Sequence, residues 1–203
     1  MERRTLVVGL AALAVTGALA LGAVAVLRPA GPAEPPAPTG SAAIGMPADA
    51  ALVDQTGKPF TAADLKGKPT AVFFGFTYCP EICPTTLMDV GRWMEALGPD
   101  ADKLRVVFIS IDPERDTPQQ LTSYLSSFDK RIRGVTGAPQ AVDHVAQGFR
   151  VYYRKVPTEG GDYTMDHSTI VYLMDGDGRF VEPVGYQEPI ERVLPKLKRL
   201  IGG

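Results

Sequence analysis

The chain of 203 residues carries 21 Lys+Arg against 23 Asp+Glu, which gives a formal net charge of −2. It contains no basic run and no interleaving of basic with aromatic residues, so the composition argues against a nucleic-acid partner. Only two cysteines are present, and the chain is long enough to build a core without disulfide staples.

The chain begins with two arginines and a long apolar segment. After Arg3 and Arg4, residues 5–27 contain no charged side chain, and these 23 residues span roughly 34 Å as a helix at about 1.5 Å per residue. This length crosses a bilayer core of about 30 Å, so 5–27 is predicted to be a transmembrane anchor. The positive-inside rule then places residues 1–4 in the cytoplasm.

A cleaved signal peptide is the alternative interpretation of this segment, because the small-residue pair Ala18/Ala20 resembles a cleavage site. Either way, the rest of the chain is exported. We expect a single-pass protein of the cell membrane whose soluble domain is periplasmic or otherwise extracytoplasmic. Residues 28–45 are rich in proline and alanine and cannot bury a core, so they are predicted to form a semi-extended tether. Residues 46–203 are predicted to form the soluble domain.

The soluble domain alternates apolar strand patterns with helix signals, such as the N-cap Thr117 followed by Pro118 at the first helical position. The elements expected in chain order are a hairpin over 51–60, a helical turn from Thr61, strand 70–76, helix 85–97, strand 104–111, helix 117–128, a short strand or connector over 134–137, helix 139–149, strand 151–155, a polar loop over 157–166, strand 169–174, its hairpin partner 179–184 and helix 189–201. This alternation predicts one α/β domain with a mixed central sheet and helices on both faces.

The two cysteines, Cys79 and Cys83, lie four positions apart, directly after the apolar strand 70–76. Open α/β sheets bind ligands beyond the carboxyl ends of their strands, which is where this pair lies. The start of the following helix favours thiolate over thiol, and two close thiolates can bind a soft metal or form a disulfide. A purely structural disulfide is available in an exported compartment, but it would close a loop of only a few residues and stabilise little.

His167 is the natural imidazole to join the two thiolates, because the other histidine, His144, lies within helix 139–149 and is interpreted as a helix-face residue. Two thiolates and an imidazole suit Cu(I), and with a further ligand Cu(II), although the same set also satisfies zinc with an open position. Asp112 follows strand 104–111 in a run of charges. It is either part of a solvated turn or a residue that orients the ligands or adds a weak one.

Three motifs in this order resemble those of the SCO/SenC family of copper chaperones. They are Phe74-Gly-Phe-Thr-Tyr-Cys-Pro-Glu-Ile-Cys-Pro-Thr-Thr-Leu87, Ile109-Ser-Ile-Asp-Pro-Glu-Arg-Asp-Thr-Pro118, and Asp166-His-Ser168 before an apolar strand. The resemblance covers residues 48–201. It implies a thioredoxin-like fold in which the redox Cys-x-x-Cys has become Cys-x-x-x-Cys, with Cys79, Cys83 and His167 as copper ligands. It also implicates Asp112 near the metal.

The resemblance further implies a membrane-tethered metallochaperone that helps to assemble the copper A centre of cytochrome c oxidase. A metallochaperone is favoured over an enzyme, and the question of an enzymatic activity stays open. Its partners would be the copper A subunit and other copper or thiol carriers. The second hypothesis is a thiol–disulfide oxidoreductase in which Cys79 and Cys83 reduce the target cysteines before metallation. A peroxidase needs one activated thiolate and leaves His167 without a role. Replacing His167 separates the first two hypotheses, because a redox role should largely survive it.

Overall fold

The computed structural model describes residues 43–202. The predicted anchor over 5–27 and most of the predicted tether lie outside the described residues, and among the described ones no helix is long and apolar enough to cross a membrane. The elements are β1 (Leu52–Asp54), β2 (Pro59–Phe60), η1 (Ala62–Leu65), β3 (Thr70–Gly75), α2 (Ile82–Leu97), η2 (Gly98–Lys103), β4 (Arg105–Ser110), α3 (Pro118–Leu125), β5 (Ile132–Thr136), α4 (Pro139–Gly148), β6 (Tyr153–Pro157), β7 (Tyr163–His167), β8 (Val171–Met174), β9 (Phe180–Val184) and α5 (Ile190–Gly202).

The central sheet has the strand order β2-β1-β5-β4-β3-β8-β9. β3, β4 and β5 run parallel to one another, whereas every other neighbouring pair in this sheet is antiparallel. All six residues of β3 are buried, as are five of the six in β4. Central strands that are covered on both faces read as continuous apolar runs, which is why the sequence identified these two. The predicted mixed sheet is confirmed.

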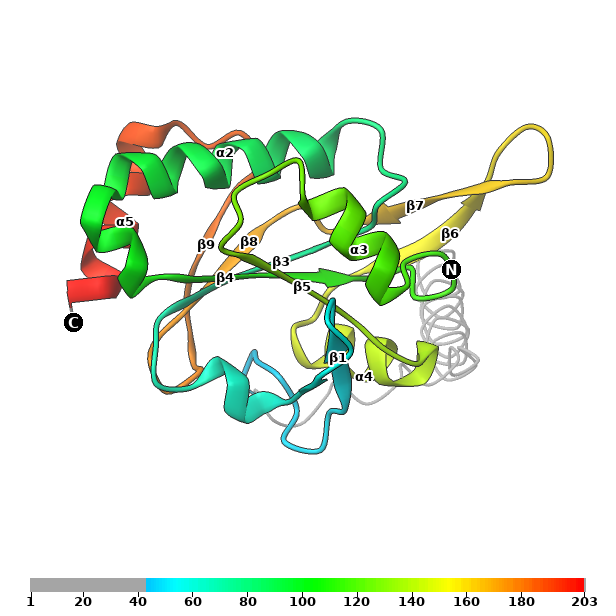
Figure 1. Cartoon of the computed structure of the whole chain (residues 1–203), viewed down its shortest axis with the longest axis horizontal. Coiled ribbons are helices and arrows are strands. Elements are labelled where there is room, and N and C mark those ends of the chain that lie inside the picture. Colours follow the sequence, from blue (N-terminus) through cyan, green and yellow to red (C-terminus); the bar gives the residue numbers. More distant parts are fainter. Residues whose placement is uncertain (1–42, 203) are drawn as a thin grey trace, which may run out of the picture. The chain divides into compact units, whose positions relative to one another are not determined.

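Helices cover both faces of this sheet, as predicted. α2 and α3 lie on one face and α4 on the other (Figure 1). The chain steps in one direction from β3 to β4 to β5, so right-handed crossovers place α2 and α3 on the same face. α5 packs against α2. A β3-α2-β4 unit joined through α4 to a β8-β9-α5 unit is the thioredoxin-like arrangement that the resemblance implied.

Helix α2 begins at Ile82, three residues before the predicted start at Thr85. Pro84 is compatible with this earlier start, because an amide in the first turn has no intrahelical acceptor and proline loses nothing there. The shift places Cys83 inside the first turn of the helix, where its side chain is buried. The beginning of α2 therefore forms part of the candidate site.

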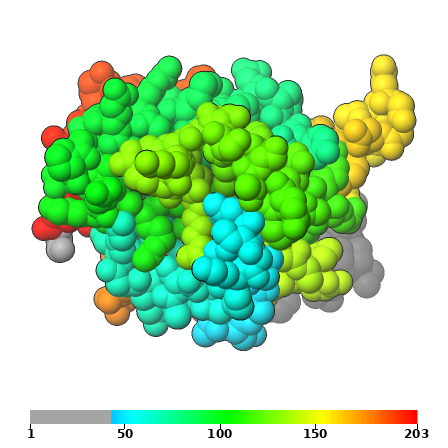
Figure 2. Space-filling model, viewed as in Figure 1, coloured from blue at the N-terminus to red at the C-terminus, as the bar shows by residue number. Residues whose placement is uncertain are grey.

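A separate two-stranded sheet corrects one prediction. The expected polar loop over 157–166 contains strand β7, which pairs antiparallel with β6 along the full length of both strands and sets His167 opposite Tyr153. Only Met165 of β7 is buried. A strand with so little apolar content does not differ from a loop in its composition, which is why the sequence pattern missed it. The tip of this hairpin stands clear of the remaining described residues (Figure 2).

Candidate metal centre

The cysteine loop is held against the end of β3 by a close approach at Gly75. A Cβ on Gly75 would lie 2.8 Å from the Cys83 Sγ and 2.7 Å from the Phe108 Cε2, both too short for non-bonded atoms. Glycine at the end of this strand therefore makes the room that the Cys83 thiol occupies. The Cys83 amide donates to the Cys79 Sγ at 3.3 Å, so an amide from the first turn of α2 faces the Cys79 sulfur.

His167, at the end of β7, is oriented by its own backbone neighbourhood. Its Nδ1 lies 2.7 Å from the Ser168 carbonyl oxygen. A carbonyl can only accept, so Nδ1 carries the proton and the lone pair is on Nε2. The Phe76 ring packs edge-on against the imidazole with centroids 5.9 Å apart. The free nitrogen, Nε2, lies 3.8 Å from the Cys83 Sγ.

The structure brings together the three residues predicted as ligands, although two of them are 84 positions apart. One donor atom from each of Cys79, Cys83 and His167 lies within 4.8 Å of the others. A metal at about 2.3 Å from sulfur and about 2.0–2.1 Å from nitrogen, with about 120° between them, separates those atoms by about 3.8 Å. The Cys83–His167 distance has this value. The soft donor set thus fits a three-coordinate metal of the Cu(I) type.

The pKa values of the two cysteines are shifted in opposite directions. The hydrogen bond from the Cys83 thiol lowers the pKa of Cys79 to about 4 against the opposing effect of partial burial, and hydrogen bonds from the backbone amides of Cys83 and Glu81 add to the shift. The neighbouring Cys79 sulfur and burial raise the pKa of Cys83. The metal-free site therefore holds one thiolate and one thiol, and binding of a cation to both sulfurs must release the Cys83 proton.

Two of the three donors, Cys79 and His167, border an open hollow of about 260 Å³. Its lining residues are Phe76, Cys79, Pro80, Glu81, Ile82, Thr164, Met165, Asp166, His167 and Thr169. Cys79 and His167 are partly exposed, whereas Cys83 is buried. An incoming ligand therefore meets Cys79 and His167 before it meets Cys83.

Asp112 is buried, so the alternative of a solvated turn is wrong. Its carboxylate accepts hydrogen bonds from Arg115 Nε and, at 2.7 Å, from the Tyr163 hydroxyl. Neither partner is a predicted ligand. Asp112 instead contacts the strand that carries His167, and a more direct role at a metal stays a prediction.

Sequence reasoning missed Asp116, which is fully buried in the same charged run. It accepts hydrogen bonds from the Thr77 amide at 3.0 Å, the Thr77 hydroxyl at 2.7 Å and the Ser110 hydroxyl at 2.6 Å. Burial raises the pKa of this carboxyl. Asp116 thereby fixes the chain two residues before Cys79. The one sequence feature that could have pointed to Asp116 is its position four residues after Asp112 in the same charged run.

His144 takes no part in this group. It lies on α4, and its Nε2 is 2.9 Å from the Asp49 carboxylate. This agrees with its interpretation as a helix-face residue.

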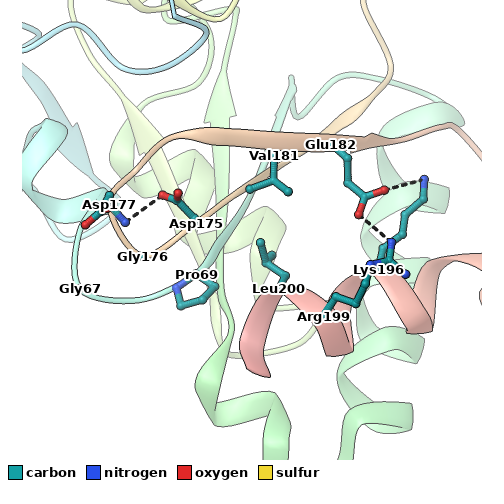
Figure 3. Close-up of a pocket in the computed structure, with 10 residues that line it drawn as sticks. All are labelled: Gly67, Pro69, Asp175, Gly176, Asp177, Val181, Glu182, Lys196, Arg199 and Leu200. Atoms are coloured by element: carbon teal, nitrogen blue, oxygen red, sulfur yellow. Dashed lines mark hydrogen bonds and ion pairs between the residues drawn. The ribbon is translucent and has the colours of Figure 1, made fainter. Parts of the chain in front are cut away.

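A larger hollow, of about 520 Å³, lies at the other end of the sheet (Figure 3). Its charged side chains are satisfied by neighbours: Arg199 donates to Glu182 at 2.9 Å, and Lys196 donates to the Pro183 carbonyl oxygen at 2.8 Å. No cysteine or histidine lines it. This hollow offers no soft metal ligand.

Curated relatives resemble the chain over most of the described residues. Protein SCO1 homolog 1, mitochondrial, from Arabidopsis thaliana is 40% identical over 153 residues, which cover 75% of this chain and 45% of the relative. Protein SCO2 homolog, mitochondrial, from Mus musculus is 38% identical over 164 residues, covering 79% and 64%. The chain thus spans about half to two thirds of the length of these relatives.

Solved structures match both the fold and the sequence. Copper-bound ScoI from Bradyrhizobium japonicum superposes with a TM-score of 0.72 at 51% identity, over 78% of this chain and 99% of that one. Copper-bound yeast Sco1 gives a TM-score of 0.73 at 36% identity, over 79% and 90%. The SCO1/SenC family model matches residues 39–202. The chain therefore belongs to the SCO1/SenC family.

Proposed function

We propose that this chain is a membrane-tethered copper chaperone that holds copper through Cys79, Cys83 and His167. The observation that carries the proposal is the meeting of these three soft donors within 4.8 Å. The donors alone would also suit zinc. The similarity to ScoI and Sco1 structures with copper bound favours copper, as Cu(I) or Cu(II).

The unequal exposure of the donors supports a role in transfer rather than storage. A ligand from a receiving protein can replace His167 and Cys79 from the open side of the hollow, while the buried Cys83 holds the ion until last. Such stepwise exchange avoids a free ion in solution. The receiver we propose is the copper A subunit of cytochrome c oxidase, with other copper or thiol carriers as further partners.

We propose that residues 5–27 anchor the chain in the cell membrane, with 1–4 in the cytoplasm and the folded domain on the extracytoplasmic side. Residues 28–45 would then act as the tether. Removal of 5–27 as a signal peptide is the alternative. Fractionation of membranes, followed by mass measurement of the N-terminal peptide, distinguishes the two.

The test of copper binding is a Cu(I) titration of the reduced, full-length chain in competition with a colorimetric chelator. We expect one copper per chain, and an affinity at least about tenfold lower in His167→Ala because one of three ligands is lost. His144→Ala is the matched control, since it removes an imidazole that is outside the site. Absence of copper binding, or equal affinities of wild type and His167→Ala, would contradict the proposal.

A thiol–disulfide oxidoreductase is the second candidate, and the asymmetry of the two cysteines favours it. The partly exposed Cys79 has a low pKa and can attack a target disulfide. Cys83 would then displace the target sulfur from the mixed disulfide, leaving a Cys79–Cys83 disulfide and two target thiols. Disulfide reduction that persists in His167→Ala, together with wild-type copper affinity in that variant, would favour this function over the first.

A further inference from the structure

The position of His167 relative to the cysteines depends on contacts between two sheets that share no ladder. Among the described residues, β6 and β7 pair only with each other. Strand pairing constrains the hairpin indirectly, through β8, which begins four residues after His167 and pairs with β3. The direct contacts between the hairpin and the cysteine loop must therefore be made by side chains. The polar contacts that could do this converge on the loop that follows β4, at the buried Asp112 and at Arg115. The exposed Glu114 of the same loop also pairs with Lys155 of the hairpin.

Arg115 lies between an aromatic ring from each of the two segments. Its guanidinium carbon is 3.8 Å from the ring centroid of Tyr163, on β7, and 4.6 Å from that of Tyr78. Tyr78 directly precedes Cys79 in the chain. The side chain of Arg115 is only 16% exposed, so these cation–π contacts are largely shielded from water and stronger than surface ones.

The same guanidinium is hydrogen-bonded to the hairpin. Arg115 Nη1 donates to the Tyr163 carbonyl oxygen at 2.9 Å and to the Asp162 carboxylate at 3.2 Å. Arg115 Nε donates to Asp112, which also accepts from the Tyr163 hydroxyl at 2.7 Å. Arg115 thus contacts both the strand that ends at His167 and the residue that precedes Cys79.

The loop that carries Arg115 is itself hydrogen-bonded to the segment before the cysteines. Asp116, the residue after Arg115, accepts hydrogen bonds from the amide and hydroxyl of Thr77. The loop that carries Arg115 is therefore fixed to the cysteine segment before the guanidinium reaches the hairpin. Lysine could keep the charge at this position, but it cannot stack a planar group between two rings while donating to three acceptors.

We propose that Arg115 is a positioning residue that sets the distance between His167 and the two cysteines. This inference rests on the proposed function, because it assigns to Arg115 control over how long the site retains copper. When lysine replaces Arg115, the planar guanidinium and its hydrogen bonds are lost, and the hairpin separates from the cysteine loop more often. The site is then reduced to its two sulfurs for part of the time, and the ion leaves faster.

The experiment compares full-length wild type with Arg115→Lys, and with Arg154→Lys as a matched control. Arg154 is on the same hairpin, but it is 62% exposed, and its ion pair is with Asp166 of the neighbouring strand. Tyr163→Phe keeps the ring and removes one hydrogen bond, so it provides a milder second variant. The three measurements are amide hydrogen exchange of the copper-free chain, the Cu(II)–thiolate absorption bands, and the rate at which an excess of chelator removes Cu(I).

For Arg115→Lys we expect amide exchange over 153–167 and Cu(I) release to be about tenfold faster, with exchange in α5 unchanged. Its Cu(II) bands should shift toward those of His167→Ala. Tyr163→Phe should accelerate release about threefold, and Arg154→Lys should match wild type.

Wild-type exchange and wild-type release in Arg115→Lys would overturn the proposal. So would exchange that accelerates equally in α5 and in the hairpin, because Arg115 would then support the fold in general. A wild-type chain that binds no copper would overturn the proposed function instead. The exchange measurement on the copper-free chain would still decide whether Arg115 holds the hairpin.

Discussion

The two ends of the central sheet each carry a hollow, and the candidate metal ligands lie at the smaller one. The larger, beyond Gly67 and Pro69 at the start of β3, has charged groups that already satisfy one another, such as Glu182 with Arg199. The smaller, beyond the end of β3, borders Cys79 and His167, whose donor atoms face a shared space. The chemical type of the donor atoms, two sulfurs and an imidazole nitrogen, rather than volume, distinguishes the site.

The largest effect should come from Cys83→Ala. The buried sulfur of Cys83 lies 3.8 Å from the imidazole Nε2, and soft thiolates are what Cu(I) requires. We expect Cu(I) affinity to fall by at least about a thousandfold, measured by chelator competition on the full-length chain. Near-wild-type affinity in this variant would remove the distinction between the two hollows.

The next effect concerns pH. Folding lowers the pKa of Cys79 to about 4 from 9.0. At pH 6 Cys79 should therefore react with iodoacetamide at close to its pH 8 rate, whereas an ordinary thiol slows about a hundredfold over this range. Alkylation followed by mass spectrometry measures both rates. A hundredfold slowing would show that Cys79 has an ordinary pKa.

The same shift has a consequence for stability. A lowered pKa stabilises the folded state fully above the ordinary value, and this contribution is lost as the pH falls toward 4. The raised pKa of Cys83 acts in the opposite sense above pH 9.0, where the unfolded chain loses a proton that the folded chain keeps. The free energy of unfolding of the reduced chain, relative to Cys79→Ala, should therefore rise between pH 5 and pH 8 in urea titrations.

A smaller effect is expected from Gly75→Ala. The new Cβ would collide with Cys83 Sγ and Phe108, so we expect a loss of roughly 1–3 kcal/mol in stability together with weaker copper binding. Gly91→Ala in α2 is the matched control, since a Cβ there meets nothing within 4 Å. It should stabilise the chain by about 0.5–1 kcal/mol. Equal effects of the two substitutions in thermal unfolding would contradict the close approach at Gly75.

The smallest effect on copper should come from the larger hollow. Lys196→Ala removes bonds to the Pro183 carbonyl oxygen and the Glu188 carboxylate. We expect a stability loss of about 1 kcal/mol in urea titrations and no change in copper affinity. A change in affinity comparable to that of His167→Ala would mean that the two ends of the sheet are coupled.

Much of this arrangement could be predicted from local patterns. The apolar runs of β3 and β4 identified the centre of the sheet, and the position of Cys79 and Cys83 after β3 placed them at its binding edge. The third donor followed from the scarcity of histidines and from the family motifs. Each of these signals depends on residues close together in the chain.

What the sequence did not reveal depends on long-range contacts. β7 is a strand because β6 pairs with it, although little in its composition distinguishes it from a loop. The role of Arg115 depends on rings at Tyr78 and Tyr163, which lie 85 positions apart and meet only in the folded chain. In the sequence, Asp116 looked like part of a charged turn. Its buried position is seen only in the folded chain, where Thr77 and Ser110 donate hydrogen bonds to its carboxylate.

The central claim is that donors from two separate segments bind one metal ion. X-ray absorption at the copper edge of the Cu(I)-loaded, full-length chain tests this most directly. The account predicts two sulfur neighbours and one imidazole nitrogen, with the imidazole signal absent in His167→Ala. Two sulfurs without an imidazole, or a site made of oxygen ligands, would contradict it.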